Sequence, residues 1–254
     1  MSDFYIKKIA VAFVVLGLSV VLFPTYGQAT QKRQHDPEIV KTADMDRTVS
    51  REKKINELLA QLRKSHDLAA VPIKAPVAMP LQPYQENDAI LGGPMATPEQ
   101  CVKYLLKVNP SPNIKVSANE LVEYYYEEGT REGVRPDVAF AQALKETGFF
   151  RYGGTVSPDQ NNYCGLGTTS AQVKGAYFSS PLLGVRAHIQ HLLAYASTKM
   201  PAEPVVDPRY DLVRSVYTDS PISTWEGLNG RWAVPGRTYG EDILQIHRGI
   251  VNEQ

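Results

Sequence analysis

One glutamate, Glu146, lies where its carboxyl group is suited to donating a proton. It follows the nearly all-apolar segment Val138–Leu144, which is typical of a buried helix, and it precedes Gly148. Apolar surroundings disfavour a charged carboxylate, and the partial negative charge at a helix C-terminus disfavours it further. A carboxyl group that keeps its proton is what glycosidic bond cleavage needs as general acid. The other interpretation of Glu146 is an exposed residue at a helix end.

A second carboxylate for glycosidic cleavage has one candidate in the segment that follows. Asp159 is the only acidic residue between Gly148 and Ser179. An inverting enzyme would need it as a base ~6.5–9.5 Å from the acid, and a retaining enzyme as a nucleophile at ~5–5.5 Å. The surrounding sequence SPDQ is equally typical of a turn.

The cysteines and histidines allow other chemistry. Cys164 could be the nucleophile of a peptidase with His188, His191 or His247 as base, but no feature of the sequence would activate it. A disulfide between Cys101 and Cys164 is more plausible in an exported chain, and two buried free thiols are the alternative. The sequence has no HExxH motif, so we expect core or rim histidines and no metal site.

The part of the chain that must position these residues is predicted to be mainly helical. Hydroxyl caps, prolines and periodic apolar residues indicate five helices. They begin near Thr97, Ser117, Pro136, Ser180 and Tyr239. The segment Gly148–Ser179 is too long for a plain turn, so we expect a functional loop or a small β-hairpin lobe there. Residues 97–254 are long enough for one core.

The first 96 residues have a different composition. Lys7 and Lys8 precede the uncharged segment Ile9–Phe23, which predicts a cleaved signal or an uncleaved membrane anchor at 1–29. Residues 30–96 are polar and then proline-rich, which indicates a spacer, with an amphipathic helix possible at 51–70. We therefore expect the rest of the chain to be exported, with the membrane contacted only through the N-terminal segment.

The charge balance excludes one class of partner. The chain has 27 Lys and Arg against 27 Asp and Glu, and a formal net charge of zero. A general nucleic-acid binder needs an excess of basic residues, so we expect none.

Five motifs follow one another along the chain: EGVRPDVAFAQ at 132–142, KETGFF at 145–150, NNYCGLG at 161–167, GVRAHIQHL at 184–192 and RWAVPGRTYG at 231–240. In this order they resemble those of the bacterial glucosaminidase family, the autolysin-type endo-β-N-acetylglucosaminidases. The resemblance implies a lysozyme-like helical fold and hydrolysis of the β-1,4 bond after N-acetylglucosamine in peptidoglycan. Glycan strands are then the partner, Glu146 is the acid, and no metal or organic cofactor is needed.

The resemblance also implies further site residues. Tyr239 matches a tyrosine thought to face the catalytic glutamate, where it would bind the substrate's 2-acetamido group or steady the transition state. Asn162 and Tyr163 match a loop that lines the sugar cleft, and Phe150 and Trp232 are further candidate substrate contacts. Tyr239 and Trp232 could instead pack in the core, and Asn162 and Tyr163 could instead serve a turn, which asparagine favours whatever the ligand.

The mechanism has alternatives. The substrate's own acetamido oxygen could attack in place of a protein nucleophile, and Tyr239 would then matter more than Asp159. A lytic transglycosylase shares the fold and the single glutamate but forms an anhydro sugar. A non-catalytic cell-wall-binding module is the alternative outside the enzymes.

Overall fold

The computed structural model describes residues 80–81, 88–168 and 174–254. The predicted signal or anchor at 1–29, the predicted helix at 51–70 and most of the spacer lie outside the described residues. Among the helices of the described part, none has the length and apolar character that crossing a membrane requires.

The described residues form six α-helices and two short 3₁₀-helices, which confirms the prediction of a mainly helical domain. The helices are α3 (Pro98–Val108), α4 (Ala118–Glu132), α5 (Pro136–Thr147), α6 (Pro181–Ala196), α7 (Tyr210–Tyr217) and α8 (Tyr239–Val251), with η1 (Pro158–Gln160) and η2 (Glu226–Leu228). All five predicted helices are present, and α7 is an additional one. Within 148–168 and 174–180 the structure has η1 but no strand, so the described part of this segment is a loop and not the β-hairpin lobe allowed by the sequence.

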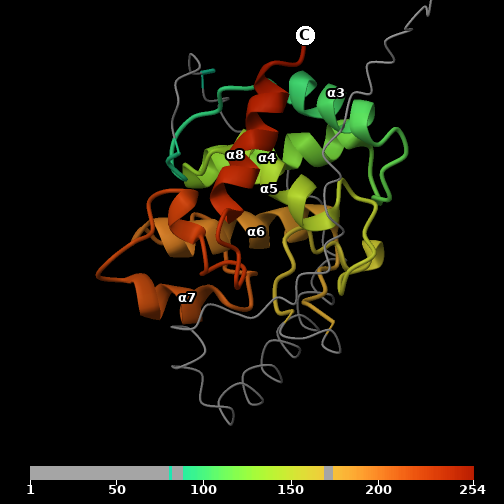
Figure 1. The fold of residues 1–254 in the computed structure, drawn as a ribbon. Helices are drawn as coiled ribbons and strands as arrows, with labels where there is room; N and C mark the ends of the chain where they lie inside the picture. The colour runs from blue at the N-terminus through green and yellow to red at the C-terminus, as the bar shows by residue number, and fades with distance from the viewer. Residues whose placement is uncertain (1–79, 82–87, 169–173) are drawn as a thin grey trace, which may run out of the picture.

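Helix α5 lies at the centre of the domain. It contacts α4 and α8 along its length and α3 at one end, and nearly all its residues are buried, as its apolar sequence predicts. Helix α6 packs against α4 and carries α7 on its other side, so that α7 lies at the edge of the domain in Figure 1. Helix α8 packs against α5, and its first residue, Tyr239, lies beside the last turn of α5, which carries Glu146.

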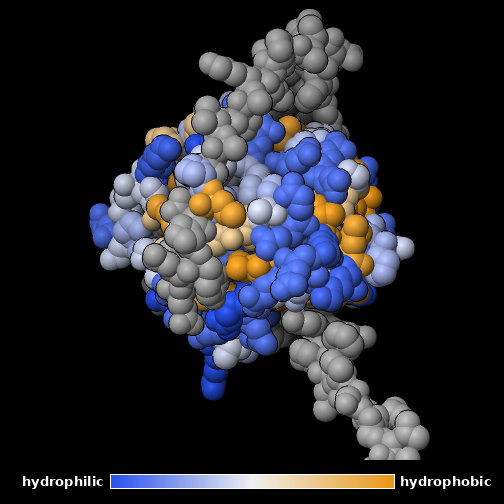
Figure 2. All heavy atoms as spheres, turned by 90° about the horizontal axis from the view of Figure 1, so that it is seen from above, coloured by the Kyte–Doolittle hydropathy of each residue, from blue (hydrophilic) through white to orange (hydrophobic). Residues whose placement is uncertain are grey.

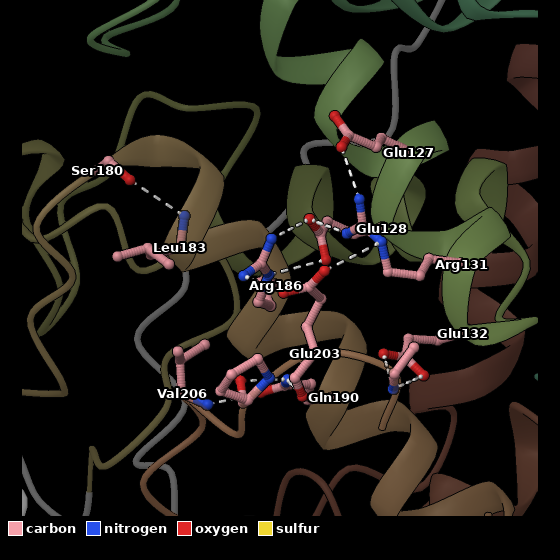
Figure 3. Close-up of polar contacts among 12 residues, drawn as sticks. Glu127, Glu128, Arg131, Glu132, Ser180, Leu183, Arg186, Gln190, Glu203 and Val206 are labelled. Atoms are coloured by element: carbon pink, nitrogen blue, oxygen red, sulfur yellow. Dashed lines mark hydrogen bonds and ion pairs between the residues drawn. The ribbon is translucent and has the colours of Figure 1, made fainter. Parts of the chain in front are cut away.

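Helix starts follow the signals in the sequence. The side chain of Thr97 accepts a hydrogen bond from the backbone of Gln100, whose own side chain bonds back to the Thr97 N–H, and this is a capping box. Ser180 caps α6 by accepting from the Leu183 N–H at 3.3 Å (Figure 3). These caps satisfy backbone donors that a helix start leaves without a partner.

The folded unit includes residues that precede Thr97, the position at which the sequence analysis placed the domain boundary. Ile90 is completely buried, and its backbone exchanges hydrogen bonds with Ser223 and Arg135. The Met95 N–H donates to Oδ2 of Asp137 at 2.7 Å. Residues 88–96, which the sequence assigned to the spacer, are therefore part of the packed domain, because an apolar residue in a proline-rich stretch gives no periodic signal.

Both cysteines are free and buried, so the disulfide between Cys101 and Cys164 is not formed. Cys101 lies in the main core, where its sulfur is 3.6 Å from the Tyr126 hydroxyl. Cys164 belongs to a separate small cluster with Leu166, Phe178 and Ala187. Burial raises the pKa of the Cys101 thiol far above its usual range, so this thiol is unreactive.

The surface is largely polar. Figure 2 shows a face on which hydrophilic residues predominate and hydrophobic residues occur in small groups. The exposed large hydrophobic residues of the described chain are scattered along the sequence: Leu81, Leu106, Tyr177, Met200 and Val205. Most apolar side chains are thus used in the core.

Candidate active site

Glu146 and Tyr239 are in direct contact. Glu146 lies in the last turn of α5 and is 6% exposed, and Tyr239 is the first residue of α8 and is 3% exposed. The Tyr239 hydroxyl donates a hydrogen bond to Oε1 of Glu146. The structure therefore brings together two candidate catalytic residues that come from different motifs.

The backbone after Glu146 is tightly coiled. Gly148 ends α5 in the left-handed conformation with φ of 59°, and Phe149, Phe150 and Tyr152 have φ of 57°, 57° and 59°. Non-glycine residues seldom adopt this conformation, and strain of this kind gathers at functional sites. Hydrogen bonds from this coil back to the last turn of α5 hold it in place, so the glutamate is presented at a rigid helix end.

Trp232 packs beside Tyr239 in a group of aromatic rings. Its ring stacks on the Tyr239 ring with centroids 6.4 Å apart and planes 14° from parallel. The edge of His191 meets it at 4.8 Å, and Tyr195 lies at 5.8 Å. Trp232 is only partly buried, whereas the other three candidate substrate contacts, Phe150, Asn162 and Tyr163, are buried.

Phe150 and Tyr163 lie in the core. Phe150 is completely buried, and it packs on Phe140 at 6.2 Å and edge-on against Tyr163 at 5.9 Å. Tyr163 is 1% exposed. Neither ring has a surface on which a sugar could stack in this structure, so both are core residues beneath the loop that follows α5.

Asn162 shapes its own loop. It is completely buried, and its amide donates to the carbonyl oxygens of Leu166 and Ala176 and accepts from the Leu166 N–H at 2.9 Å. The turn interpretation of this asparagine therefore describes the structure better than the cleft-lining one, because both ends of the amide are already used.

Asp159, the candidate second carboxylate, is exposed. The hydroxyl groups of Ser157 and Tyr177 donate to its two oxygens, each at 2.5 Å. These two hydrogen bonds hold the pKa of Asp159 below its usual range. The carboxylate is thus charged and tied to its own loop.

The three histidines considered as bases for a peptidase all bond to other groups. His191 Nδ1 lies 2.8 Å from Asp207, and His247 Nε2 lies 2.6 Å from Asp137. His188 is completely buried, with Gln142 and Tyr125 on its two nitrogens. None of these contacts is made to Cys164. No group of three metal-ligating side chains occurs in residues 80–81, 88–168 and 174–254.

A line of hydrogen-bonded, buried polar groups leads away from the Glu146–Tyr239 pair, and the sequence analysis did not predict it. Gln142 Nε2 donates to the Tyr239 hydroxyl at 2.7 Å, and Gln142 Oε1 lies 2.8 Å from His188 Nε2. His188 Nδ1 is 3.0 Å from the Tyr125 hydroxyl. A signal for it exists, because Gln142 is the one polar residue in the segment 138–144 and lies one helical turn before Glu146.

Helices α4 and α6, which carry Tyr125 and His188 of this line, are joined by ion pairs (Figure 3). Arg186 of α6 donates to both carboxylate oxygens of Glu128 of α4, at 3.1 and 3.0 Å. Arg131 donates to the same carboxylate at 2.5 Å. The Glu128 side chain is completely buried, and two guanidinium groups compensate its charge. The register of α4 against α6 is therefore set by charge as well as packing.

Comparison with known proteins now identifies the family. The model of the glucosaminidase family, described as mannosyl-glycoprotein endo-beta-N-acetylglucosaminidase, matches residues 122–250. The chain belongs to the glucosaminidase family. The matched residues include both Glu146 and Tyr239.

One relative shares much of the domain. An uncharacterized protein of Borreliella burgdorferi is 41% identical over 148 residues, which cover 58% of this chain and 70% of that protein. No solved structure matches the chain. Membership of the glucosaminidase family suggests a glycoside hydrolase with a glycan substrate, of the kind that degrades peptidoglycan.

Proposed function

We propose that this glucosaminidase-family protein hydrolyses peptidoglycan at the β-1,4 bond after N-acetylglucosamine, with Glu146 as general acid. The observation that carries the proposal is the buried hydrogen bond from Tyr239 to Glu146. Two motifs that are far apart in the sequence converge there on one carboxyl group. Family membership supports the substrate class.

Glu146 donates its proton to the glycosidic oxygen as the bond to that oxygen breaks. The glutamate is then a carboxylate in a nearly closed environment, where an uncompensated charge is costly. The Tyr239 hydroxyl is already directed at Oε1 and stabilises that charge as it develops. The pair therefore lowers the barrier without having to rearrange.

For the group that attacks the anomeric carbon in this step, we favour the substrate's own acetamido group over a protein carboxylate. The acetamido oxygen attacks the anomeric carbon while the glycosidic bond breaks and the Glu146 proton moves to the leaving oxygen. Water then opens the cyclic intermediate and returns a proton to Glu146. This route is supported by Asp159, whose carboxylate is exposed and held by Ser157 and Tyr177 rather than directed at the Glu146–Tyr239 pair.

Trp232 is proposed to hold the sugar beside the acid. Its partly buried ring lies parallel to Tyr239, and a flat aromatic face suits the apolar face of a sugar ring. His191, held by Asp207, packs edge-on against the same ring and keeps it in place.

The site of action is proposed to be the cell envelope. The sequence of 1–29 is typical of an export signal or anchor, and the spacer that follows would let the domain reach a glycan meshwork. Peptidoglycan lies outside the cytoplasmic membrane, so the predicted export of the domain is consistent with the proposed substrate.

Digestion of purified peptidoglycan, with mass spectrometry of the products, tests the proposal. We expect muropeptides that end in a reducing N-acetylglucosamine, and their loss in Glu146→Gln. Anhydro sugars would instead show a lytic transglycosylase. Retained binding to the wall without new reducing ends would show a binding module, and either result would contradict hydrolysis.

A further inference from the structure

The buried groups behind Tyr239 form one continuous line. It runs from Tyr125 through His188 and Gln142 to Tyr239 and ends on Glu146, with separations of 3.0, 2.8 and 2.7 Å along its first three steps. Tyr125, His188 and Gln142 are completely buried, so a group left without its partner in the line would carry a desolvation cost. Each group must donate to, or accept from, its neighbours in the line.

Such a line has two self-consistent directions. In one, every donor points toward Glu146, and the Tyr239 hydroxyl donates a hydrogen bond to Oε1. In the other, every donor points away, so that Glu146 is protonated on Oε1 and donates a hydrogen bond to the Tyr239 hydroxyl oxygen. The Gln142 amide and the His188 ring can serve either direction, because each has a donor on one side and an acceptor on the other when the imidazole is neutral.

The imidazole of His188 is neutral. Burial, with a smaller effect from His191, lowers the pKa of His188 to about 3. Only one of its two nitrogens therefore carries a proton, and the direction of the line decides which one. A charged ring would instead donate on both sides and break the line.

Tyr125 selects between the directions. Within the described chain its hydroxyl has one hydrogen-bond partner, Nδ1 of His188. If His188 donated to Tyr125, the hydroxyl proton of Tyr125 would be buried without an acceptor. If Tyr125 donates, every proton has an acceptor, since a hydroxyl oxygen can remain without a donor at little cost. The line must then point toward Glu146.

The helices that hold Tyr125 and His188 are fixed in register. Tyr125 lies one turn before Glu128 on α4, and His188 lies two residues after Arg186 on α6. The two-pronged Glu128–Arg186 pair in Figure 3 therefore joins α4 to α6 close to the residues that carry this hydroxyl and this ring.

We propose that Gln142, His188 and Tyr125 are positioning residues that keep the Tyr239 hydroxyl donating to Oε1 of Glu146. The acidic proton of Glu146 is thereby confined to the other carboxyl oxygen, Oε2. This inference rests on the proposed function of Glu146 for its effect on catalysis. The direction of the line itself is a structural statement that can be measured without any activity.

The direct measurement is the tautomer of His188 by ¹⁵N NMR of the full chain at neutral pH. The proposal requires the form with the proton on Nε2. A proton on Nδ1 would overturn it, whether or not the protein cleaves peptidoglycan. In Tyr125→Phe the fixed direction is lost, so we expect the Nε2–H signal to weaken or to be joined by that of the other tautomer.

The catalytic consequence is tested by double-mutant cycles with Tyr239→Phe, on soluble glycan strands freed of their peptides. Gln142→Met and Tyr125→Phe should each lower kcat by between about 3-fold and 10-fold, with KM nearly unchanged. In the Tyr239→Phe background they should change kcat by less than about 2-fold, because they act only through that hydroxyl. Equal losses in both backgrounds would overturn the proposal.

His247→Gln is the matched control. His247 pairs with Asp137, so this change also removes a buried polar contact between α8 and α5, but away from the line. It should lower thermal stability and leave kcat unchanged in both backgrounds. If wild type released no reducing ends at all, the proposed function would fail while the tautomer result would still stand. If the wild type is active but the losses in kcat add to that of Tyr239→Phe, the positioning role of Gln142 and Tyr125 would fail while the proposed function would stand.

Discussion

His247 Nε2 lies 2.6 Å from Oδ2 of Asp137, at the end of the α5–α8 helix pair opposite to Glu146 and Tyr239. Both contacts join α5 to α8, one near the start of α5 and one near its end. Burial by itself would raise the pKa of Asp137, but His247, Arg135 and the Met95 N–H outweigh it and hold that pKa below its usual range. The two helices are thus joined by a buried polar contact near each end of α5.

The Tyr239 hydroxyl should matter less than the Glu146 carboxyl. Tyr239→Phe removes one hydrogen bond to a group that becomes charged, which is worth about 1.5–3 kcal/mol and so about 10–100-fold in kcat. Initial rates on soluble glycan strands measure this. A loss as large as that of Glu146→Gln would give the phenol a larger role than stabilising the carboxylate.

Asp159→Asn separates the two mechanisms. Substrate assistance predicts that most activity remains, because the exposed Asp159 carboxylate serves only to hold Ser157 and Tyr177. Direct displacement with Asp159 as base predicts a loss nearly as large as that of Glu146→Gln. We expect the mild result. Ser157→Ala, which removes one of the bonds to the same carboxylate, is the control for disturbing the loop.

Stability should fall in mild acid because of His188. Its pKa is about 3 in the folded protein and ~6.5 in an unfolded chain. Between these values the unfolded state binds a proton that the folded state does not, so this contribution to stability falls with falling pH by up to about 1.4 kcal/mol per unit. Urea unfolding at about pH 7, 6 and 5 measures the slope, and His188→Gln should reduce it by up to that amount. An unchanged slope would contradict a neutral buried ring.

A chain that begins at Thr97 should be less stable than one that begins at Pro80. The longer chain keeps the completely buried Ile90 side chain, whose burial contributes about 1.5–3 kcal/mol. It also keeps the hydrogen bonds from Met95 and Ala96 to Asp137. Thermal unfolding of the two chains measures the difference. Equal melting temperatures would show that residues 88–96 add nothing to the domain.

Much of the fold was predictable from local signals. The capped helices α3, α4 and α6 begin where Thr97, Ser117 and Ser180 predict, because caps and periodic apolar residues act within one or two turns. Helix α7 was not predicted, since its eight residues are too few for a clear period. Segment 88–96 was assigned to the spacer because its contacts come from distant residues.

The candidate site was predictable in part. A motif match indicated Glu146 and Tyr239, and these two are in contact. The same kind of match placed Asn162 and Tyr163 in a loop that lines the cleft, but both side chains are buried. A motif identifies positions along the chain and does not say where side chains point. Gln142 was missed because its role depends on Tyr239, which lies in another motif.

The most direct test of the account is the release of reducing ends from purified peptidoglycan by Glu146→Gln. Glutamine keeps the shape of the side chain but cannot donate the acidic proton, a step worth about 10²–10⁴-fold in rate. We expect activity to fall by at least that factor while circular dichroism and the melting temperature show an intact fold. Full activity in Glu146→Gln would contradict the assignment of Glu146 as the acid and the function proposed from it.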